Sequence, residues 1–300
     1  MAALLITGAT GKQGGSLIRS LISRNASFEV LAVTRDPTSA SAQKLQSLSS
    51  NIKLIQGDLD TPTEIFRNAQ KSTSTPIWGV YSVQAAIGNS SEEIQGKALI
   101  DEAIKQKVKF FVYSSVDRGG KERSYTNPTK IPHFIKKHNI EHYLVDKTQN
   151  IEMQWSILRP VAFYENLTPD FFGKVFATCF KMALKGRSLQ LVATSDIGYF
   201  GADAFMNPGS YQGKAVSLAG DELTYEQMER AFTSRIRKPL PTTFQPICSF
   251  FMATMKDMGY MFKWFHDEGY GADIKRLREV NPDMRTFDAW LEKESGFSKS

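Results

Sequence analysis

The first residues that could do chemistry are three glycines near the start of the chain. Gly8, Gly11 and Gly14 follow a short apolar run at residues 4–6, and helical spacing begins at Ser16. Glycine permits a tight strand-to-helix turn, a close approach of backbone N–H groups to phosphate and close packing of helix on strand. The positive end of the helix dipole adds to the attraction for an anion. We therefore predict a pyrophosphate site, and so a dinucleotide site, at this turn; the alternative is a glycine-rich turn without a ligand.

The end of the predicted second strand indicates which dinucleotide is bound. Arg35 lies about twenty residues beyond Gly14, where an NAD-specific fold places an acid that accepts from the ribose 2′-hydroxyl. The planar fork of an arginine can instead bond a 2′-phosphate, and Lys12 adds positive charge in the turn. The pattern favours NADP over NAD. The alternative is that Asp36 accepts from the ribose while Arg35 faces solvent.

Polar side chains at the ends of two later strands extend the predicted cofactor site. Asp58, which follows Gly57, could accept from the adenine amino group or could cap a helix. Ser82, Val83 and Gln84 end the fourth predicted strand, where the chain should pass the middle of the cofactor. Their assignment depends on position alone.

Alternating strands and helices must position these residues. Apolar strand candidates alternate with helical segments through the first half of the chain, which predicts a doubly wound parallel sheet of the Rossmann type, an α/β fold with its ligands at the C-terminal ends of the strands. One intervening helix is introduced by Asn89, Ser90 and Ser91. The predicted strands are residues 30–33, 52–55, 77–81, 110–113 and 156–158.

Beyond about residue 165 the pattern loosens into aromatic segments that contain proline and glycine, with strands predicted at residues 189–193 and 215–218. We predict an NADP-binding Rossmann domain over residues 1–165, with a returning segment near 188–206. A smaller, interwoven α+β region for substrate or partner then covers residues 166–300.

Three helices are predicted in this second region. Thr224 and Gln227 form a capping-box pattern that predicts a helix through Phe232. A short helix is predicted at 282–291. Residues 247–265 carry Phe and Met at three- and four-residue spacing, which predicts one amphipathic helix whose apolar face belongs to the core or forms a wall for an apolar ligand.

Composition narrows the classes of function. The chain has 300 residues, 41% of them hydrophobic, which is enough for a large core. Its two cysteines, Cys179 and Cys248, lie far apart without metal-like spacing, so neither a disulfide framework nor a metal site is predicted. With no signal-peptide pattern and no membrane span, we expect a cytoplasmic location, with a nuclear one also open. The net charge is +6, but the basic residues are scattered, which argues against direct nucleic-acid binding.

The sequence resembles the NmrA-like family of atypical short-chain dehydrogenases/reductases through the ordered segments TGATGKQGG, VTRDP, GDLD, YSSVD, HFIKK, RPVAFYENL, ATSDIGYFGADAF and NPDMRTFDAWLE. The resemblance implies an NADP(H)-binding Rossmann domain and a smaller C-terminal domain for a small-molecule substrate or a regulated protein partner. By motif, the resemblance places four groups of residues at the cofactor: Gly8, Ala9, Thr10, Gly11, Lys12, Gln13 and Gly14 at the pyrophosphate; Arg35, Asp36 and Ser39 at the 2′-phosphate; Asp58 and Leu59 at adenine; and Lys137, Phe163, Tyr164, Glu165 and Asn166 at the nicotinamide half.

The wider superfamily catalyses with a tyrosine and a lysine four residues apart on a helix and a serine at the end of the preceding strand. Lys137 keeps the lysine, and Ser114 and Ser115 end the fifth strand, with Ser115 the candidate for the serine's role. His133 stands where the tyrosine is expected. A spacing of four places His133 and Lys137 on one helix face.

Two interpretations of this replacement stay open. In the first, Lys137 or His133 is the general acid of an NADPH-dependent oxidoreductase that acts on a small apolar carbonyl, quinone or related conjugated compound. In the second, Lys137 only anchors ribose hydroxyls, and the protein is a non-catalytic NADPH/NADP redox sensor that regulates a partner such as a transcription factor. Further candidates for the acid are Tyr125, Tyr143 and Tyr164.

Overall fold

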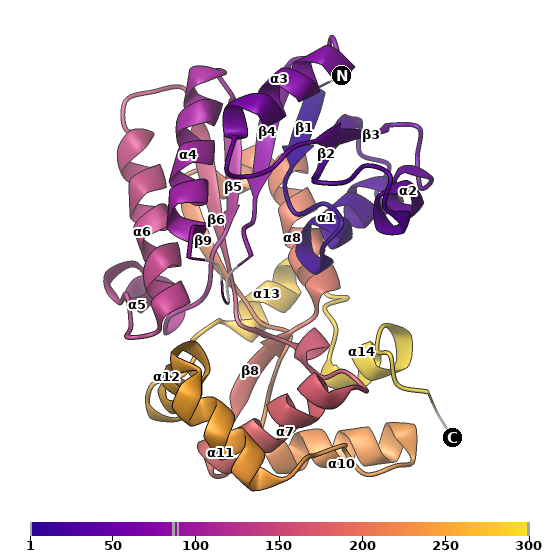
Figure 1. The fold of residues 1–300 in the computed structure, drawn as a ribbon, viewed down its shortest axis with the longest axis vertical. Coiled ribbons are helices and arrows are strands. Elements are labelled where there is room, and N and C mark those ends of the chain that lie inside the picture. The colour runs from indigo at the N-terminus through magenta and orange to yellow at the C-terminus, as the bar shows by residue number, and fades with distance from the viewer. Residues whose placement is uncertain (1, 86–87, 89, 299–300) are drawn as a thin grey trace. The chain divides into compact units, whose positions relative to one another are not determined.

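The computed structural model describes residues 2–85, 88 and 90–298, so Asn89 of the predicted helix start lies outside the described residues (Figure 1). The chain forms two compact units. The first comprises Met1–Ser115, Lys136–Arg159 and Ile197–Val216, and the second comprises Val116–Ile135, Pro160–Asp196 and Ser217–Ser300. The domains predicted from the sequence, with a boundary at 165 and a return near 188–206, stay a prediction.

The main sheet confirms the predicted Rossmann-type α/β fold. Its strands follow the order β3-β2-β1-β4-β5-β6-β9, and the neighbouring pairs from β3 to β6 are parallel. All five strands predicted in the first half of the chain are present, and the strand predicted at 215–218 is β9. The bounds are β1 (Ala2–Ile6), β2 (Phe28–Thr34), β3 (Ile52–Gln56), β4 (Ile77–Ser82), β5 (Phe110–Ser114), β6 (Gln154–Pro160) and β9 (Lys214–Leu218).

Side chains alternate between the two faces of the sheet along each strand, and both faces are apolar. Helices therefore cover both faces. Leu5 of β1 packs into a core with residues of α3, α4 and α6, whereas Leu4 and Phe205 of α8 meet at Gly79 on the opposite face. Figure 1 shows α3, α4 and α6 on one side and α1 and α8 on the other. The bounds are α1 (Lys12–Ser23), α2 (Ala40–Gln46), α3 (Pro62–Ser72), α4 (Glu92–Lys105), α6 (Pro132–Lys147), α8 (Thr194–Met206) and α9 (Pro208–Tyr211).

A glycine motif explains how α8 lies so close to α1. A Cβ on Gly198 would lie 2.4 Å from the backbone carbon of Ser16, and a Cβ on Gly201 would lie 2.6 Å from Leu17 Cδ1. The spacing of these two glycines in α8 therefore allows close helix packing behind the glycine turn.

The second unit contains the small sheet β10-β8-β7, formed by β7 (Ala162–Phe163), β8 (Leu189–Val192) and β10 (Asp221–Leu223). β8 confirms the strand predicted at 189–193. The helices of this unit are α5 (Gly120–Thr126), the short 3-10 helix η1 (Tyr164–Asn166), α7 (Phe171–Leu184), α10 (Tyr225–Ile236), α11 (Gln245–Thr254), α12 (Lys256–Asp267), α13 (Ile274–Val280) and α14 (Phe287–Lys293).

Two helix starts in the second unit are set by side-chain caps. The predicted capping box is confirmed, because Gln227 N–H donates to Thr224 Oγ1 and Thr224 N–H donates to Gln227 Oε1. The C-terminal helix predicted at 282–291 begins later, at Phe287. Thr286 accepts from the N–H of Ala289 and so fixes this start.

The single helix predicted over 247–265 is wrong, because the chain breaks at Met255 into α11 and α12. α12 packs back on α11, and Gly259 permits this, since a Cβ there would lie 2.2 Å from the Met252 carbonyl oxygen. A one-residue break leaves the apolar spacing nearly unchanged, so periodicity could not reveal it. Phe262 and Phe265 are buried in the core, while Ile247 and Met255 are exposed. None of the described helices has the length and apolar composition needed to cross a membrane.

Candidate cofactor and active site

The glycine turn after β1 has the geometry that a dinucleotide site requires. Gly8 has φ +58°, and a Cβ on it would lie 2.7 Å from Val83 Cγ1. A Cβ on Gly14 would lie 2.4 Å from the carbonyl oxygen of Gly8. The N–H of Gly11 donates to that same oxygen at 2.9 Å, and Gly11 is the N-cap of α1. Because glycine has no side chain with which to cap the helix, the first N–H groups of α1 can bind an anion.

The other residues predicted at the pyrophosphate lie in the same turn. Ala9 is buried, whereas Thr10 and Lys12 are exposed. Gln13, in the first turn of α1, accepts a hydrogen bond from Ser114 Oγ at 2.6 Å and one from the Tyr81 hydroxyl at 3.5 Å. Gln13 therefore ties the start of α1 to the ends of β4 and β5.

Arg35 and Asp36, in the loop after β2, have different surroundings. Asp36 Oδ1 accepts from both the N–H and the hydroxyl of Thr38, at 2.8 and 2.6 Å. These bonds, the one from the hydroxyl first, lower the pKa of Asp36. Ser39 donates its hydroxyl to the Asp36 carbonyl oxygen at 2.8 Å. Arg35 is exposed, and none of the salt bridges of the described residues includes it. The Asp36 carboxylate thus shapes the loop, while the guanidinium of Arg35 remains available to a ligand.

The residues predicted after β3 and β4 lie at the corresponding strand ends. Asp58 Oδ1 accepts from the N–H of Asp60 at 3.0 Å, so this carboxylate stabilises the turn before α3 and leaves its second oxygen for another donor. Leu59 packs against the core. Ser82 and Gln84 are buried, and Gln84 Nε2 donates to Ser82 Oγ at 2.8 Å. Their predicted contacts with cofactor stay predictions.

Two serines stand at the end of β5, as expected. Ser114 is fully buried with its hydroxyl on Gln13, and burial raises the pKa of the neighbouring Tyr81. Ser115 is also buried, and its N–H donates to the Leu158 carbonyl oxygen at 2.7 Å. That bond continues the pairing of β5 with β6 past the last residue of β5.

The side chain of Lys137, on α6, also reaches the end of β5. Its Nζ lies 2.9 Å from Oε1 of Glu92, the first residue of α4, and 3.5 Å from the carbonyl oxygen of Ser114, which accepts from it. The same Nζ lies 5.9 Å from the centre of the Tyr113 ring. Lys137 is only 6% exposed and Glu92 is fully buried. The sequence pattern gave no sign of this partner, since an acid in the first turn of a helix is ordinarily there for the helix dipole.

His133 lies in the second unit and is held by a carboxylate. Its Nδ1 lies 2.8 Å from Asp257 Oδ1, which also accepts from the backbone N–H of His133 at 3.1 Å. Asp257 thus fixes the imidazole and the first turn of α6 together. Its ring also packs edge-on against Phe134. A catalytic role for His133 stays a prediction.

The run predicted at the nicotinamide half also lies in the second unit. Phe163 ends β7 and is half-buried, and Asn166 is exposed. Tyr164 is buried against Phe287 and Trp290. Glu165 Oε1 accepts from the N–H and the hydroxyl of Thr194, at 2.9 and 2.7 Å. The cofactor contacts predicted for Phe163, Tyr164, Glu165 and Asn166 stay predictions, and Glu165 in addition accepts the two bonds from Thr194.

The candidate tyrosine acids have different surroundings. The Tyr143 hydroxyl donates to both carboxylate oxygens of Asp101, and burial together with Asp101 raises the pKa of Tyr143 to about 12. The Tyr164 hydroxyl donates to the Arg285 carbonyl oxygen at 3.4 Å, and burial raises its pKa well above the usual value. Tyr125 is 40% exposed. A raised pKa makes Tyr143 and Tyr164 weaker acids near neutral pH.

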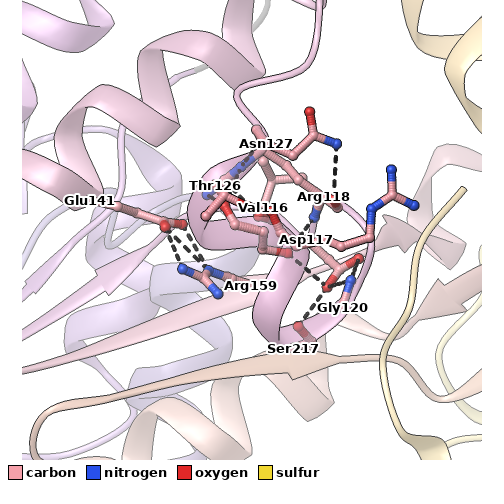
Figure 2. A network of polar contacts seen from close by, with 11 residues as sticks. Val116, Asp117, Arg118, Gly120, Thr126, Asn127, Glu141, Arg159 and Ser217 are labelled. Atoms are coloured by element: carbon pink, nitrogen blue, oxygen red, sulfur yellow. Dashed lines mark hydrogen bonds and ion pairs between the residues drawn. The ribbon is translucent and has the colours of Figure 1, made fainter. Parts of the chain in front are cut away.

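Figure 2 shows two buried polar groups that anchor the surrounding backbone. Within the first unit, Glu141 of α6 accepts from Arg159 of β6 through Nε at 3.1 Å and Nη2 at 2.6 Å. Within the second unit, Asp117 accepts from the N–H groups of Gly119 and Gly120 and from the hydroxyl of Ser217. Asp117 also accepts from Gly271 N–H and Ser124 Oγ. These five donors give Asp117, the last residue of the YSSVD segment, a structural role in this loop.

A family model and curated relatives of the same family name match this chain, and solved structures share its fold. The model of the NmrA-like family matches residues 2–291. An NmrA-like family domain-containing oxidoreductase, ptmS of Penicillium ochrochloron, is 26% identical over 96% of each chain. Among solved structures, an NADPH-dependent quinone oxidoreductase of Escherichia coli, complexed with NADPH, has a TM-score of 0.72 at 21% identity and covers 96% of this chain and 98% of its own. NmrA, a negative transcriptional regulator in complex with NADP, has a TM-score of 0.70 at 16% identity, covering 98% and 95%.

Proposed function

Since the chain belongs to the NmrA-like family, we propose that it is an NADPH-dependent oxidoreductase that reduces a small apolar carbonyl, quinone or related conjugated compound. The observation that carries the proposal is the buried ammonium of Lys137, whose Nζ contacts the Ser114 carbonyl oxygen at the C-terminal end of β5. The C-terminal ends of parallel strands are where such folds bind ligands and react them. The names of the Penicillium and Escherichia coli proteins agree with this class of reaction.

The glycine turn fits the pyrophosphate of the cofactor. Side chains at Gly8 and Gly14 would clash with Val83 and with the Gly8 carbonyl oxygen, so the backbone itself forms the surface of the turn. The first N–H groups of α1 face this turn and would hold phosphate oxygens. We propose that the first unit binds the cofactor through those of the predicted residues that it contains.

Arg35 selects the phosphorylated cofactor in this proposal. In the alternative, in which Asp36 accepts from a ribose 2′-hydroxyl, only Oδ2 would serve, because Oδ1 already accepts the two bonds from Thr38. The exposed guanidinium of Arg35 can bond a 2′-phosphate through several N–H groups. The exposed arginine in this loop therefore favours NADP(H).

Lys137 completes the reaction as the proton donor. When bound, NADPH supplies the hydride that adds to the substrate. The ammonium of Lys137 gives one proton to the substrate oxygen, which balances the negative charge left there. The substrate gains a hydride and a proton, and the cofactor is oxidised by two electrons. Ser115, which directly follows β5, would orient the substrate oxygen.

The redox-sensor function is the second candidate, favoured by His133. This residue stands where the superfamily places its tyrosine, and its Nδ1 is bonded to Asp257. The structural likeness to a negative transcriptional regulator agrees with a sensor. In this function the nicotinamide redox state would change binding of a protein partner without turnover.

Turnover separates the two functions. Purified protein is given NADPH with quinones, enones and aromatic ketones, and loss of NADPH absorbance is followed for the wild type and for Lys137→Ala. The oxidoreductase proposal expects turnover with at least one acceptor and its loss in the variant. Tight NADPH binding without oxidation by any acceptor, together with redox-dependent partner binding, would establish the sensor instead.

A further inference from the structure

We propose that Glu92 is the positioning residue of the reaction: its buried carboxylate holds the ammonium of Lys137 at the end of β5 in the orientation from which the proton is given. This inference rests on the proposed oxidoreductase function. It assigns a role to a residue that sequence patterns indicate only as the start of a helix.

The first support is the burial of the pair. Glu92 is fully buried and the Lys137 side chain is 8% exposed, with 2.9 Å between Oε1 and Nζ. A lone carboxylate or ammonium at such depth is strongly unfavourable, so each charge keeps the other in place. Lys137 has four rotatable side-chain bonds, and a fixed counter-charge restricts where its Nζ can be.

The second support is that the Glu92 carboxylate is not saturated. Neither Oε1 nor Oε2 accepts a hydrogen bond from any described residue, so its contact with Lys137 is an ion pair without hydrogen-bond alignment. Glu141, another fully buried acid of this unit that is paired with a cation, is bonded by both Nε and Nη2 of Arg159. The Glu141 pair is thus hydrogen-bonded, whereas the Glu92 carboxylate holds Lys137 Nζ by charge and takes none of its N–H donors in a hydrogen bond.

The third support is what remains for the ammonium to do. Lys137 Nζ has three N–H donors. One side of the group faces Glu92 and another faces the Ser114 carbonyl oxygen at 3.5 Å. The charge of Glu92 on α4 and the Ser114 carbonyl oxygen on β5 together restrict where Nζ and its remaining N–H groups can point. Without Glu92 only the weak contact with Ser114 would orient it.

Glu93 provides a matched control on the same helical turn. It is an acid paired with Lys97, at 2.5 Å, and it also accepts from Asn139 at 3.0 Å. Its side chain is 29% exposed. Neutralising Glu93 changes the charge of α4 by the same amount as neutralising Glu92, without touching Lys137.

The test is a double-mutant cycle on the full chain with Glu92→Gln, Lys137→Met and the two together, and with Glu93→Gln as control. We expect Glu92→Gln to lower kcat about ten- to a hundredfold with little change in KM, and to have no further effect in the Lys137→Met background. Glu92→Asp, which keeps the charge, should recover part of kcat. Glu93→Gln should leave kcat unchanged.

Thermal unfolding of the same proteins without cofactor separates positioning from folding. Glu92→Gln leaves the Lys137 charge buried and unpaired, so its melting temperature should fall, and the double variant, which buries no charge, should regain stability but not activity. If the folded Glu92→Gln protein keeps the wild-type kcat, or if Glu92→Gln and Lys137→Met lower kcat independently, the positioning role is wrong. Absence of turnover in the wild type, or full activity in Lys137→Met, would instead overturn the proposed function itself.

Discussion

Lys137 Nζ and Glu92 Oε1 lie 2.9 Å apart in a pair whose side chains are 8% and 0% exposed. α6 and α4, which carry these residues, lie on the same face of the sheet. The ion pair therefore places a buried cation beside the end of β5, where a Rossmann-type fold presents its reactive groups. Arg35 and the glycine turn, also in the first unit, are the residues that we propose bind the cofactor at that end of the sheet.

Replacing Arg35 should weaken NADPH far more than NADH. Losing one charge-assisted contact with the 2′-phosphate costs about 1.5–3 kcal/mol, or roughly ten- to a hundredfold in affinity. Fluorescence titration of Arg35→Ala with both cofactors measures the effect, and Arg67→Ala, an exposed arginine on α3, is the control. Equal weakening of NADPH and NADH would show that Arg35 does not contact the 2′-phosphate.

Adding one methyl group at Gly14 should damage both the turn and cofactor binding. A Cβ there meets the Gly8 carbonyl oxygen at 2.4 Å, and such overpacking typically costs about 1–3 kcal/mol. Gly14→Ala should therefore have a lower melting temperature and bind NADPH weakly. Gly209→Ala is the control, since nothing lies within 4 Å of a Cβ at Gly209. Similar behaviour of the two variants would contradict the steric account of the turn.

Breaking the buried pair of Glu141 and Arg159 should destabilise the protein strongly. Glu141→Gln leaves the Arg159 charge buried without a counter-charge, which costs about 3–5 kcal/mol. The half-exposed pair of Glu93 and Lys97 is worth about 0–1 kcal/mol, so Glu93→Gln should change stability little. Urea unfolding of both variants gives the comparison. A loss below 1 kcal/mol in Glu141→Gln would show that the pair does not anchor α6 to β6.

Asp196 should make stability depend on pH in the direction opposite to an ordinary acid. Burial, only partly offset by the Arg285 N–H, raises the pKa of Asp196 from 3.8 to about 7. The folded state therefore binds more protons than the unfolded state between these values, and stability falls as the pH rises through that window. Above about pH 7 the full penalty, on the order of a few kcal/mol, is present.

The Asp196→Asn variant tests this, since an amide oxygen can still accept from the Arg285 N–H. Its melting temperature should exceed that of the wild type at pH 8, and the difference should shrink towards pH 4. Asp283→Asn, at an exposed position, should show no such trend. A difference that stays constant with pH would mean that Asp196 is charged throughout.

Local stereochemistry made much of the fold predictable from the sequence. The glycine turn and the strands follow from backbone conformation and side-chain periodicity, which a short window contains. The capping box at Thr224 is equally local. The place of Arg35 directly after the second strand is local in the same sense, and its predicted contact with the ribose phosphate stays a prediction.

Long-range pairs could not be predicted in this way. Glu92 and Lys137 are far apart in the sequence, and neither has a pattern that points to the other. Asp117 likewise finds donors from segments as distant as Ser217 and Gly271. The break at Met255 was not predicted, because the apolar spacing along α11 and α12 is nearly the same as that of a single helix. Charge pairing and helix breaks depend on tertiary contacts that periodicity does not encode.

We propose that this chain uses NADPH to reduce a substrate with Lys137 as proton donor. Single-turnover oxidation of protein-bound NADPH after mixing with a quinone, compared between the wild type and Lys137→Ala, tests this proposal. We expect oxidation by the wild type and a rate about 10²–10⁴-fold lower in the variant, the usual contribution of a general acid. Undiminished oxidation in Lys137→Ala, or bound NADPH that no quinone, enone or ketone oxidises, would contradict the claim.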